Sequence, residues 1–503
     1  MFYLLLIGII TLVLFLWRRN FKYWEKEGIH FDKPHMLFGS LTSLMQRKHN
    51  FGTAIYDIYT KHKEPFLGIY ILFRPAILVR DAAICKDMLT TSFASFHDRG
   101  VYVDLKNDPF SANLFSSKGQ YWRSLRTKLT PSFTSGRLKA MFPTLIESVN
   151  NLVDHISENI PDGDKGTVFE VKDLMSRYGI DLTASSILGV ENNSFKNPFN
   201  DFRMVGLFFN SKSLLRTVQI AAGFLYPDIE KVMRFFGFRD KVREFMRKIV
   251  KETVEFREKN NFMRKDLMQM LIQLRNTGTI NPDENHWKVQ TVAEDLKSMS
   301  MEELSGEGFI FFVASFENAA NTSTYCLHEL LQNPDILEAL LEEINEVLKK
   351  YDSEMCYDAV KEMKLLDRCI METNRKYPFT ILNRICTENY KIPGHDYTIK
   401  KGTPIVMSLM GLHRDEEYFP NPLKFDPERF LNNNYNSAAY MPFGEGPRHC
   451  IAYRLGQMNA KVAIVKLLTT FKFECLEKRE IEFDNYGATL MPKGGVNIKI
   501  FKK

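Results

Sequence analysis

A cysteine near the carboxyl end of the chain lies in a run whose residue types are suited to chemistry. Cys450 follows the loop Pro442-Phe443-Gly444-Glu445-Gly446-Pro447-Arg448-His449 and precedes an apolar stretch able to form a helix. A helix start offers free backbone N–H groups and a positive dipole end, which favour thiolate over thiol. The glycines let the backbone approach a flat ligand closely, Phe443 can shield the sulfur from water, and Arg448 is a fixed cation suited to a carboxylate. A lone cysteine is more often a buried structural residue, but these surroundings favour a functional sulfur.

This run resembles the haem-thiolate signature Phe-x-x-Gly-x-Arg-x-Cys-x-Gly of the cytochrome P450 family, with Ala452 in place of the last glycine. The resemblance extends over nearly the whole chain. It implies a mainly α-helical fold with small β-sheets, in which a single large catalytic domain holds the haem between two long helices. It also implies that Cys450 is the axial ligand of the haem iron and that Phe443, Gly446 and Arg448 bind the haem. A thiolate ligand donates electron density that favours cleavage of the O–O bond.

A tryptophan and an arginine earlier in the chain lie one helical turn apart. Trp122 and Arg126 occupy positions i and i+4, so they share one face of a helix. Such a pair is common, but in register with the family's Trp-x-x-x-Arg it resembles a pair that donates to the haem propionates, with Arg384 as a further candidate. Nearby cations form a solvated basic face by default, and the resemblance makes them part of a docking surface for a reductase: Arg123, Lys128, Arg137 and Lys139.

Glu372 and Arg375 match the family's Glu-x-x-Arg motif, and Arg429 lies in the run Asp426-Pro427-Glu428-Arg429-Phe430. A helix-surface ion pair is the plain interpretation of such spacing, and it contributes only a few tenths of a kcal/mol. The resemblance implies instead a buried cluster of Glu372, Arg375 and Arg429. Its role would be structural, because it would hold the scaffold of the haem loop in place.

The helix expected from about 302 to 332 departs from the family pattern at its centre. Residues 311–322 align with the oxygen-binding segment Ala-Gly-x-Glu-Thr, but Ser315 replaces the glycine and Asn318 replaces the threonine, while Glu317 is kept. The resemblance implies that Glu317 and Asn318 organise water on the distal side of the haem. A carboxamide binds water but relays a proton less readily than a hydroxyl. We therefore predict slower or leakier oxygen activation, with more peroxide released per product.

Two phenylalanines are candidates for the substrate cavity. The stretches 93–100 and 107–115 resemble the insect microsomal branch of the family, which handles plant toxins and insecticides, and this makes Phe110 and Phe115 candidate cavity walls. Isolated phenylalanines are more often core residues. The aromatic-rich stretch 199–238 is interpreted either as amphipathic helices packed on the core or as a lid over the cavity that dips into the bilayer. Periodicity does not separate the two.

Local patterns predict several elements outside these motifs. Residues 65–80 read as a β-hairpin around Arg74-Pro75, and strands are expected at 396–408. In 241–259 the apolar residues recur with helical spacing opposite Lys, Arg and Glu. Residues 488–501 are expected to form a terminal hairpin.

The amino terminus reads as a retained membrane anchor. Residues 2–17 are almost wholly apolar and reach about 24 Å, a little less than the roughly 30 Å of a bilayer core. An interfacial aromatic belt would extend the span through Trp17, Phe21, Tyr23 and Trp24. No positive residue precedes the run and no cleavage site follows it, which argues against a signal peptide. We expect an anchor at 1–19, a linker or hinge at 20–40 and a haem-thiolate catalytic domain at 41–503. The cations that follow the run place this domain on the cytosolic side of the membrane, and the resemblance to the microsomal branch implies that this is the endoplasmic reticulum membrane.

Composition, charge and cysteine content limit the classes of fold, partner and compartment that fit the chain. The 503 residues are 45% hydrophobic and include 40 phenylalanines, enough for a large core and an apolar cavity. The net charge is +6 (67 basic and 61 acidic residues), too small to indicate nucleic-acid binding. Seven scattered cysteines show no disulfide framework, which favours a reducing compartment.

These patterns, with the resemblance, predict a membrane-anchored monooxygenase that contains haem b. It would insert one oxygen atom from O2 into lipophilic small molecules, either xenobiotics or endogenous lipids and hormones. Electrons would come from NADPH through a partner reductase, with a small haem protein as a further donor. Two alternatives stay open: a haem-thiolate isomerase or dehydratase that acts on oxygenated lipids without O2, motivated by Asn318, and a catalytically impaired paralogue that binds haem or hydrophobic molecules.

Overall fold

The computed structural model describes residues 20–503 apart from 37, 164, 210–222, 224–226, 228–240, 380 and 488. The anchor expected at 1–19 and most of the aromatic stretch 199–238 lie outside the described residues. Within the described part of the chain, no helix combines the length and apolar composition needed to cross a membrane.

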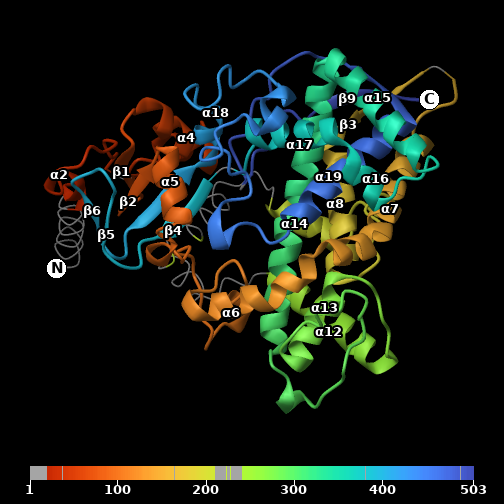
Figure 1. Cartoon of the computed structure of the whole chain (residues 1–503), viewed down its shortest axis with the longest axis horizontal. Helices are drawn as coiled ribbons and strands as arrows, with labels where there is room; N and C mark the ends of the chain where they lie inside the picture. Colours follow the sequence, from red (N-terminus) through yellow and green to blue (C-terminus); the bar gives the residue numbers. More distant parts are fainter. Residues whose placement is uncertain are drawn as a thin grey trace, which may run out of the picture.

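Helices form most of the described chain, as predicted (Figure 1). The α-helices are α2 (Tyr23–Lys26), α3 (Thr42–Met45), α4 (Phe51–Lys61), α5 (Ala82–Leu89), α6 (Gly119–Leu129), α7 (Ser135–Glu158), α8 (Val171–Thr183), α9 (Asp201–Phe209), α12 (Lys241–Asn260), α13 (Leu267–Thr277), α14 (Met301–Gln332), α15 (Pro334–Lys350), α16 (Tyr357–Glu362), α17 (Lys364–Lys376), α18 (Leu409–Arg414) and α19 (Tyr453–Thr470). The short helices are η1 (Phe93–Ser95), η2 (Pro109–Ser111), η3 (Thr130–Phe133), the π-helix η4 (Ala184–Leu188), η5 (Glu294–Leu296), η6 (Pro427–Asn433) and η7 (Gly446–Arg448). The helices expected at 241–259 and 302–332 are confirmed as α12 and α14.

Helix α14 runs through the middle of the protein, with α8 and α19 alongside it (Figure 1). Its 32 residues span about 48 Å. A capping box starts it, because the Ser300 hydroxyl accepts from the Glu303 N–H while the Glu303 carboxylate accepts from the Ser300 N–H. Helix α8 crosses it closely at Gly179, where an added Cβ would lie 2.5 Å from the Phe316 carbonyl oxygen. The central helix is therefore held tightly against its neighbour.

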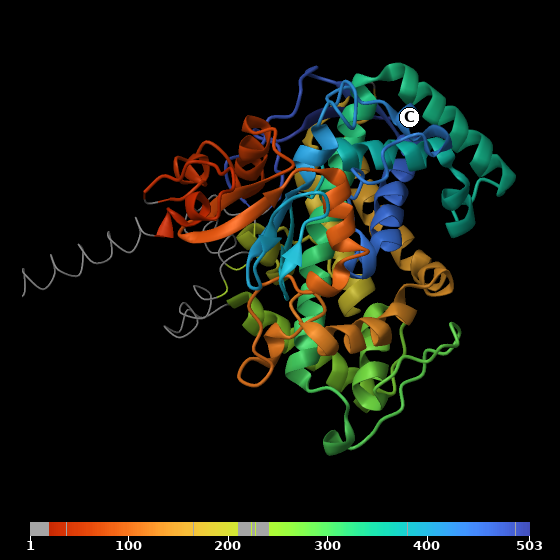
Figure 2. The same cartoon turned by 60° about the vertical axis from the view of Figure 1, so that its left-hand side comes forward.

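The strands form small sheets, also as predicted. The strand bounds are β1 (Phe66–Ile71), β2 (Arg74–Val79), β3 (Thr167–Glu170), β4 (Ile381–Ile385), β5 (Tyr390–Lys391), β6 (Thr398–Ile399), β7 (Pro404–Ser408), β8 (Phe471–Cys475) and β9 (Asn497–Lys502). A four-stranded sheet has the order β1-β2-β7-β4 and lies to one side of α14 (Figure 1 and Figure 2). The other sheets have the orders β3-β9-β8 and β5-β6.

Two details of the predicted strands differ from the structure. The hairpin at 65–80 is confirmed, but Arg74 and Pro75 lie inside β2, opposite Ile71 and Tyr70, so the turn falls at residues 72–73. The terminal hairpin at 488–501 is wrong. Strand β9 pairs on one side with β8 and on the other with β3, because it forms the centre of its sheet and takes partners that lie far away in the sequence.

The segment that follows residue 19 is packed on the four-stranded sheet. Trp24 is completely buried, and its indole N–H donates to the Ile69 carbonyl at 3.0 Å. Gly68 makes room for this ring, because a Cβ there would lie 2.5 Å from it. The expectation that Trp24 belongs to an interfacial aromatic belt is therefore wrong: β1 offers the ring a better apolar surface than the membrane interface does.

Two hydrophobic cores lie on either side of the cysteine loop. One surrounds α14 and includes α7, α8 and α19, and the other surrounds the four-stranded sheet and includes α4 and α5. Residues from both sides reach the loop, since Arg126 comes from α6 and Arg384 from β4. The site around Cys450 therefore lies between the two cores.

Candidate haem-thiolate site

The loop that carries Cys450 is held in a fixed shape. The Cys450 N–H donates to the Phe443 carbonyl at 2.8 Å, and α19 begins three residues later at Tyr453. Gly446 has a φ of +69°, and a Cβ there would lie 1.8 Å from the Leu89 carbonyl oxygen of α5. Only glycine satisfies both the backbone angle and the close contact at this position.

The groups around the Cys450 sulfur shift the pKa of its thiol in opposite directions. Burial raises the pKa of the Cys450 thiol, while the N–H of Ala452 and the charges of Arg126 and Arg99 lower it. The sequence reasoning expected the helix start to favour the thiolate, but burial outweighs the N–H and the cations, so the pKa of the Cys450 thiol is raised overall. Because burial favours the neutral thiol, a metal ion bound to the sulfur would be what makes the thiolate stable here.

Four arginines gather beside the cysteine loop. Arg126 donates to the His449 carbonyl at 3.0 Å, and Arg99 donates to the Arg448 carbonyl at 3.4 Å. Arg448 donates to the carbonyls of Phe115 and Ser117 and stacks over Trp122, 4.1 Å from the ring centre. Arg384 on β4 is 2% exposed. Arg99 was missed as a site residue by the sequence reasoning, although it lies in a stretch that resembles the family.

The positive charge of the four arginines exceeds the negative charge of the side chains that face them. Burial, with the repulsion between these cations, lowers the pKa of Arg448 to about 9 and holds that of Arg384 well below its ordinary value. Asp98 is the carboxylate that faces Arg448, at 3.5 Å. Buried guanidinium nitrogens find no hydrogen-bond acceptor among the described residues: Arg99 Nε, Arg384 Nε and Nη2, and Arg448 Nε. Such a cluster is costly unless a ligand with more than one negative charge binds to it.

An accessible stripe interrupts the buried centre of α14. Ala314 and Asn318 are exposed, one turn apart, while Phe312, Phe316 and Glu317 beside them are buried. Exposure in the middle of the central helix means that this face borders a hollow. The Asn318 side-chain amide donates to the Ala314 carbonyl at 2.7 Å, so its N–H is turned back on its own helix.

Glu317 points to the other side of α14. Its carboxylate accepts from Lys172 of α8 at 2.8 Å, and both side chains are 5% exposed. Lys172 also donates to the Ser176 hydroxyl at 2.8 Å. The sequence reasoning did not find Lys172, because a lysine 145 residues away carries no local signal. The predicted pair Glu317 and Asn318 thus occupies two different surroundings.

The residues present fit a haem. A dianionic porphyrin edge would satisfy the arginine nitrogens that lack acceptors, a flat ring would occupy the hollow beside Ala314, and the Cys450 sulfur would bind the iron.

The comparisons with known proteins agree with this geometry. The family model described as cytochrome P450 matches residues 29–500. The chain belongs to the cytochrome P450 family. Probable cytochrome P450 6d5 of Drosophila melanogaster is 46% identical over 99% of both chains. Cytochrome P450 6d3 of Musca domestica is 44% identical over 99% of this chain and 98% of its own, and cytochrome P450 6k1 of Blattella germanica is 36% identical over 96% and 93%. This P450 is therefore a haem-thiolate monooxygenase.

The predicted glutamate–arginine cluster of the P450 comes together in the structure. Arg375 donates to both oxygens of Glu372, at 2.7 and 2.8 Å, and both side chains are fully buried. Arg429 of η6 donates to Glu372 at 3.3 Å and to the carbonyls of Pro420 and Asn421. Arg375 also donates to the carbonyls of His413 and Pro422. The cluster fastens the loop before the cysteine run to α17.

The two phenylalanines predicted to line the substrate cavity lie in different surroundings. Phe115 lies under the Arg99 guanidinium, 4.3 Å from the ring centre, beside the arginine cluster. Phe110 is buried and packs against Phe309 of α14 and beneath Arg243.

Arg123 and Lys128 of the predicted basic face are exposed, but the prediction that Arg137 belongs to this face is wrong. Arg137 is 1% exposed, because its guanidinium donates to three carbonyls of the loop 281–286.

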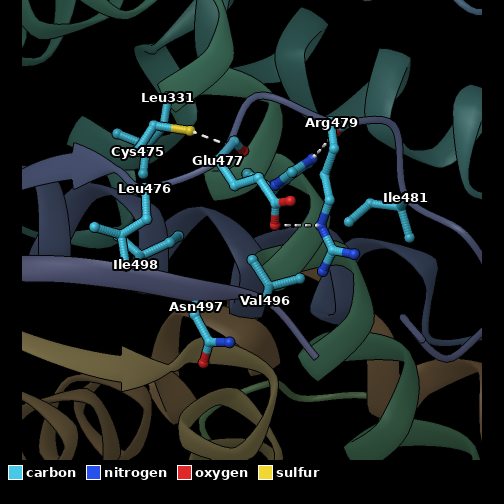
Figure 3. A pocket seen from close by; sticks show the side chains of 10 residues that line it. Leu331, Cys475, Leu476, Glu477, Arg479, Ile481, Val496, Asn497 and Ile498 are labelled. Carbon is cyan, nitrogen blue, oxygen red and sulfur yellow. Dashed lines mark hydrogen bonds and ion pairs between the residues drawn. The ribbon is translucent and has the colours of Figure 1, made fainter. Parts of the chain in front are cut away.

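A separate small cavity lies beside β8 and β9 (Figure 3). Its volume is about 50 Å³, and Arg479 and Glu477 pair at its rim at 3.3 Å. Small-molecule sites are usually several times larger, from about 300 Å³ upward. This cavity therefore offers the P450 no substrate site.

Proposed function

We propose that this P450 inserts one oxygen atom from O2 into lipophilic small molecules, either xenobiotics or endogenous lipids and hormones. The balanced reaction consumes one O2, one NADPH and one proton for each substrate and releases hydroxylated product, NADP⁺ and water. The electrons pass through a partner reductase. The observation that carries the proposal is the Cys450 sulfur set beside buried arginines, several of whose side-chain nitrogens find no acceptor among the described residues.

Different residues of the protein would bind different parts of the haem b. Arg99, Arg126, Arg384 and Arg448 would bind the propionates, with Trp122 packed against Arg448. Phe443 and Gly446 shape the loop that presents Cys450. The bound haem supplies oxygen activation, and its thiolate ligand favours cleavage of the O–O bond.

On the distal side the residues bind water and handle protons. Asn318 turns its amide N–H to the Ala314 carbonyl, which leaves the amide oxygen to accept from water in the hollow. An acceptor of this kind orders water without donating a proton to it. Glu317 is held by Lys172, so it reaches distal water only when that pair opens. We propose that proton delivery is correspondingly slow and that peroxide escapes.

Phe115, beside the arginines, is proposed as a wall of the substrate cavity. Phe110, which lies in η2 and packs against Phe309 of α14, is proposed to support that wall. We also propose that residues 1–19 anchor the protein in the endoplasmic reticulum membrane, that 20–40 connect the anchor to the catalytic domain at 41–503, and that this domain faces the cytosol. The run of cations after the apolar stretch supports this orientation.

The absorption spectrum of the reduced, carbon monoxide-bound protein tests the assignment. We expect a strongly red-shifted band in the wild type and in the control Cys475→Ser, because Cys475 is a free cysteine of strand β8 and not of the loop that carries Cys450. The Cys450→Ser variant should lose the band. Retention of the band and of the iron in Cys450→Ser would refute the haem assignment.

Product formation then separates the monooxygenase from its alternatives. We expect turnover of lipophilic substrates only with O2, NADPH and reductase present. Turnover of a lipid hydroperoxide without NADPH would instead indicate the isomerase or dehydratase, which the replacement of threonine by Asn318 favours. Haem binding without either activity would indicate the impaired paralogue.

A further inference from the structure

Three side chains that play no part in the haem site converge at the edge of the four-stranded sheet. His30 precedes Phe31, which bridges to Gly68 of β1. His62 is the residue directly after α4, and Glu64 lies just before β1. One ligand atom of each lies within 4.8 Å of the others. Imidazole nitrogens and a carboxylate are the ligands that zinc prefers in three-ligand sites.

The distances between these side chains are close to those between the ligands of a bound metal ion. His30 Nε2 lies 3.0 Å from His62 Nδ1 and 3.5 Å from Glu64 Oε1, and His62 Nδ1 lies 4.0 Å from the other carboxylate oxygen, Glu64 Oε2. Ligands at about 2.0–2.1 Å from a tetrahedral zinc ion are separated from one another by about 3.3 Å. A rotation of the Glu64 carboxylate, with a small shift of the exposed His30 ring, would bring one carboxylate oxygen and both nitrogens to that spacing.

A fourth residue fixes the orientation of one imidazole. The other nitrogen of His62, Nε2, lies 3.1 Å from Asp32 Oδ1, so Nε2–H donates to the carboxylate and Nδ1 keeps its lone pair. Metal-binding histidines usually donate their second N–H to such a carboxylate. With this tautomer of His62, His30 Nε2–H donates to the Nδ1 lone pair. A divalent ion would take the place of that proton when His30 carries its N–H on Nδ1 instead, so both rings would bind the ion as neutral imidazoles.

The backbone already holds the ligands in place. The Gly68 N–H donates to the His30 carbonyl and the Asp32 N–H donates to the Gly68 carbonyl, both at 2.9 Å. The Glu64 carbonyl accepts from Arg80 at 3.2 Å. The His30 side chain is half exposed while that of His62 is 17% exposed, so an ion can enter from solvent and keep a water as its fourth ligand.

We propose that His30, His62 and Glu64 bind a zinc ion, with Asp32 positioning His62. The ligands come from two segments, 30–32 and 62–64, so the ion fastens the chain that follows the amino-terminal segment to α4 and β1. It stabilises this edge of the catalytic domain independently of the haem.

Zinc binding is measured on full-length, tag-free holoprotein, stripped with a chelator and then dialysed against Zn²⁺, with zinc and iron determined separately. We expect one zinc per chain in the wild type and in the control His35→Ala, an exposed histidine nearby whose ring stacks on Phe38. His30→Ala, His62→Ala and Glu64→Gln should each weaken binding at least tenfold, and Asp32→Asn should weaken it about 10- to 100-fold. The carbon monoxide spectrum of each variant shows whether it remains folded.

Thermal unfolding gives a second readout. Zinc should raise the unfolding temperature of the wild type and of His35→Ala but not that of His62→Ala, and magnesium, which prefers oxygen ligands, should raise none of them. Equal zinc affinity in the wild type, His30→Ala and His62→Ala would overturn the proposal. So would the absence of any stoichiometric zinc in the wild type, which would leave the cluster as hydrogen bonds at the surface.

Discussion

Replacing Lys172 by methionine tests how strongly the buried pair holds α8 against α14. The change removes a cation that is 5% exposed and 2.8 Å from Glu317, while the side chain keeps a similar volume. Removing one partner of a buried ion pair usually costs about 3–5 kcal/mol, because the other charge is left uncompensated. We therefore expect the free energy of unfolding to fall by several kcal/mol at pH 7.

The double variant Lys172→Met/Glu317→Gln removes both charges of the pair. It should therefore recover most of the stability that Lys172→Met loses, because no buried charge has lost its lysine partner.

The assay is urea denaturation at pH 7 followed by circular dichroism, on samples with matched haem content. Lys251→Met is the control, because Lys251 and Glu255 form an exposed pair at 3.8 Å whose loss should be barely measurable. A loss in Lys172→Met that equals that of the control would refute the reasoning. A large loss that the double variant does not recover would also refute it.

Three further predictions concern the haem site and its scaffold. Asn318→Thr should raise the product formed per NADPH and lower the peroxide released, because a hydroxyl donates a proton where the amide oxygen only accepts; unchanged coupling would contradict this. Arg384→Met should weaken haem binding at least tenfold yet raise the unfolding temperature of the haem-free protein, because Arg384 Nε and Nη2 are buried without acceptors; haem titration and thermal unfolding check it, and a less stable haem-free variant would count against it. Burial lowers the pKa of His413 to about 3, so its neutral ring stabilises the fold fully above about pH 6.5 and this stability is lost as the pH falls, by about 2 kcal/mol at pH 5. His413→Gln, which can still accept from the Met441 N–H, should show a smaller drop in stability between pH 7 and pH 5, and an unchanged drop would assign the acid sensitivity to other groups.

Local motifs were enough to predict the family, the fold class and the elements that carry the site. The glycine-flanked run around Cys450 and the helix-spaced motifs on α6 and α17 depend on neighbours within a few residues, which the sequence displays directly. The prediction of a terminal hairpin was wrong because the pairing of β9 depends on residues far away in the sequence. The partners of β9 are strands 22 or more residues away, and the local pattern of residues 488–501 does not specify them.

The sequence by itself determined which residue types are available: a sulfur in a loop that needs glycine, arginines in family register, and an asparagine where a hydroxyl is usual. Only the tertiary structure decided what each of them faces. It buried Arg99 and Arg384 with side-chain nitrogens that find no acceptor in the described part of the chain, gave Glu317 a lysine partner on α8, and brought His30 to His62 across the edge of a sheet. Charge and coordination act over a few ångströms through space, and the chain brings residues that are tens or hundreds of positions apart within that range only when it folds.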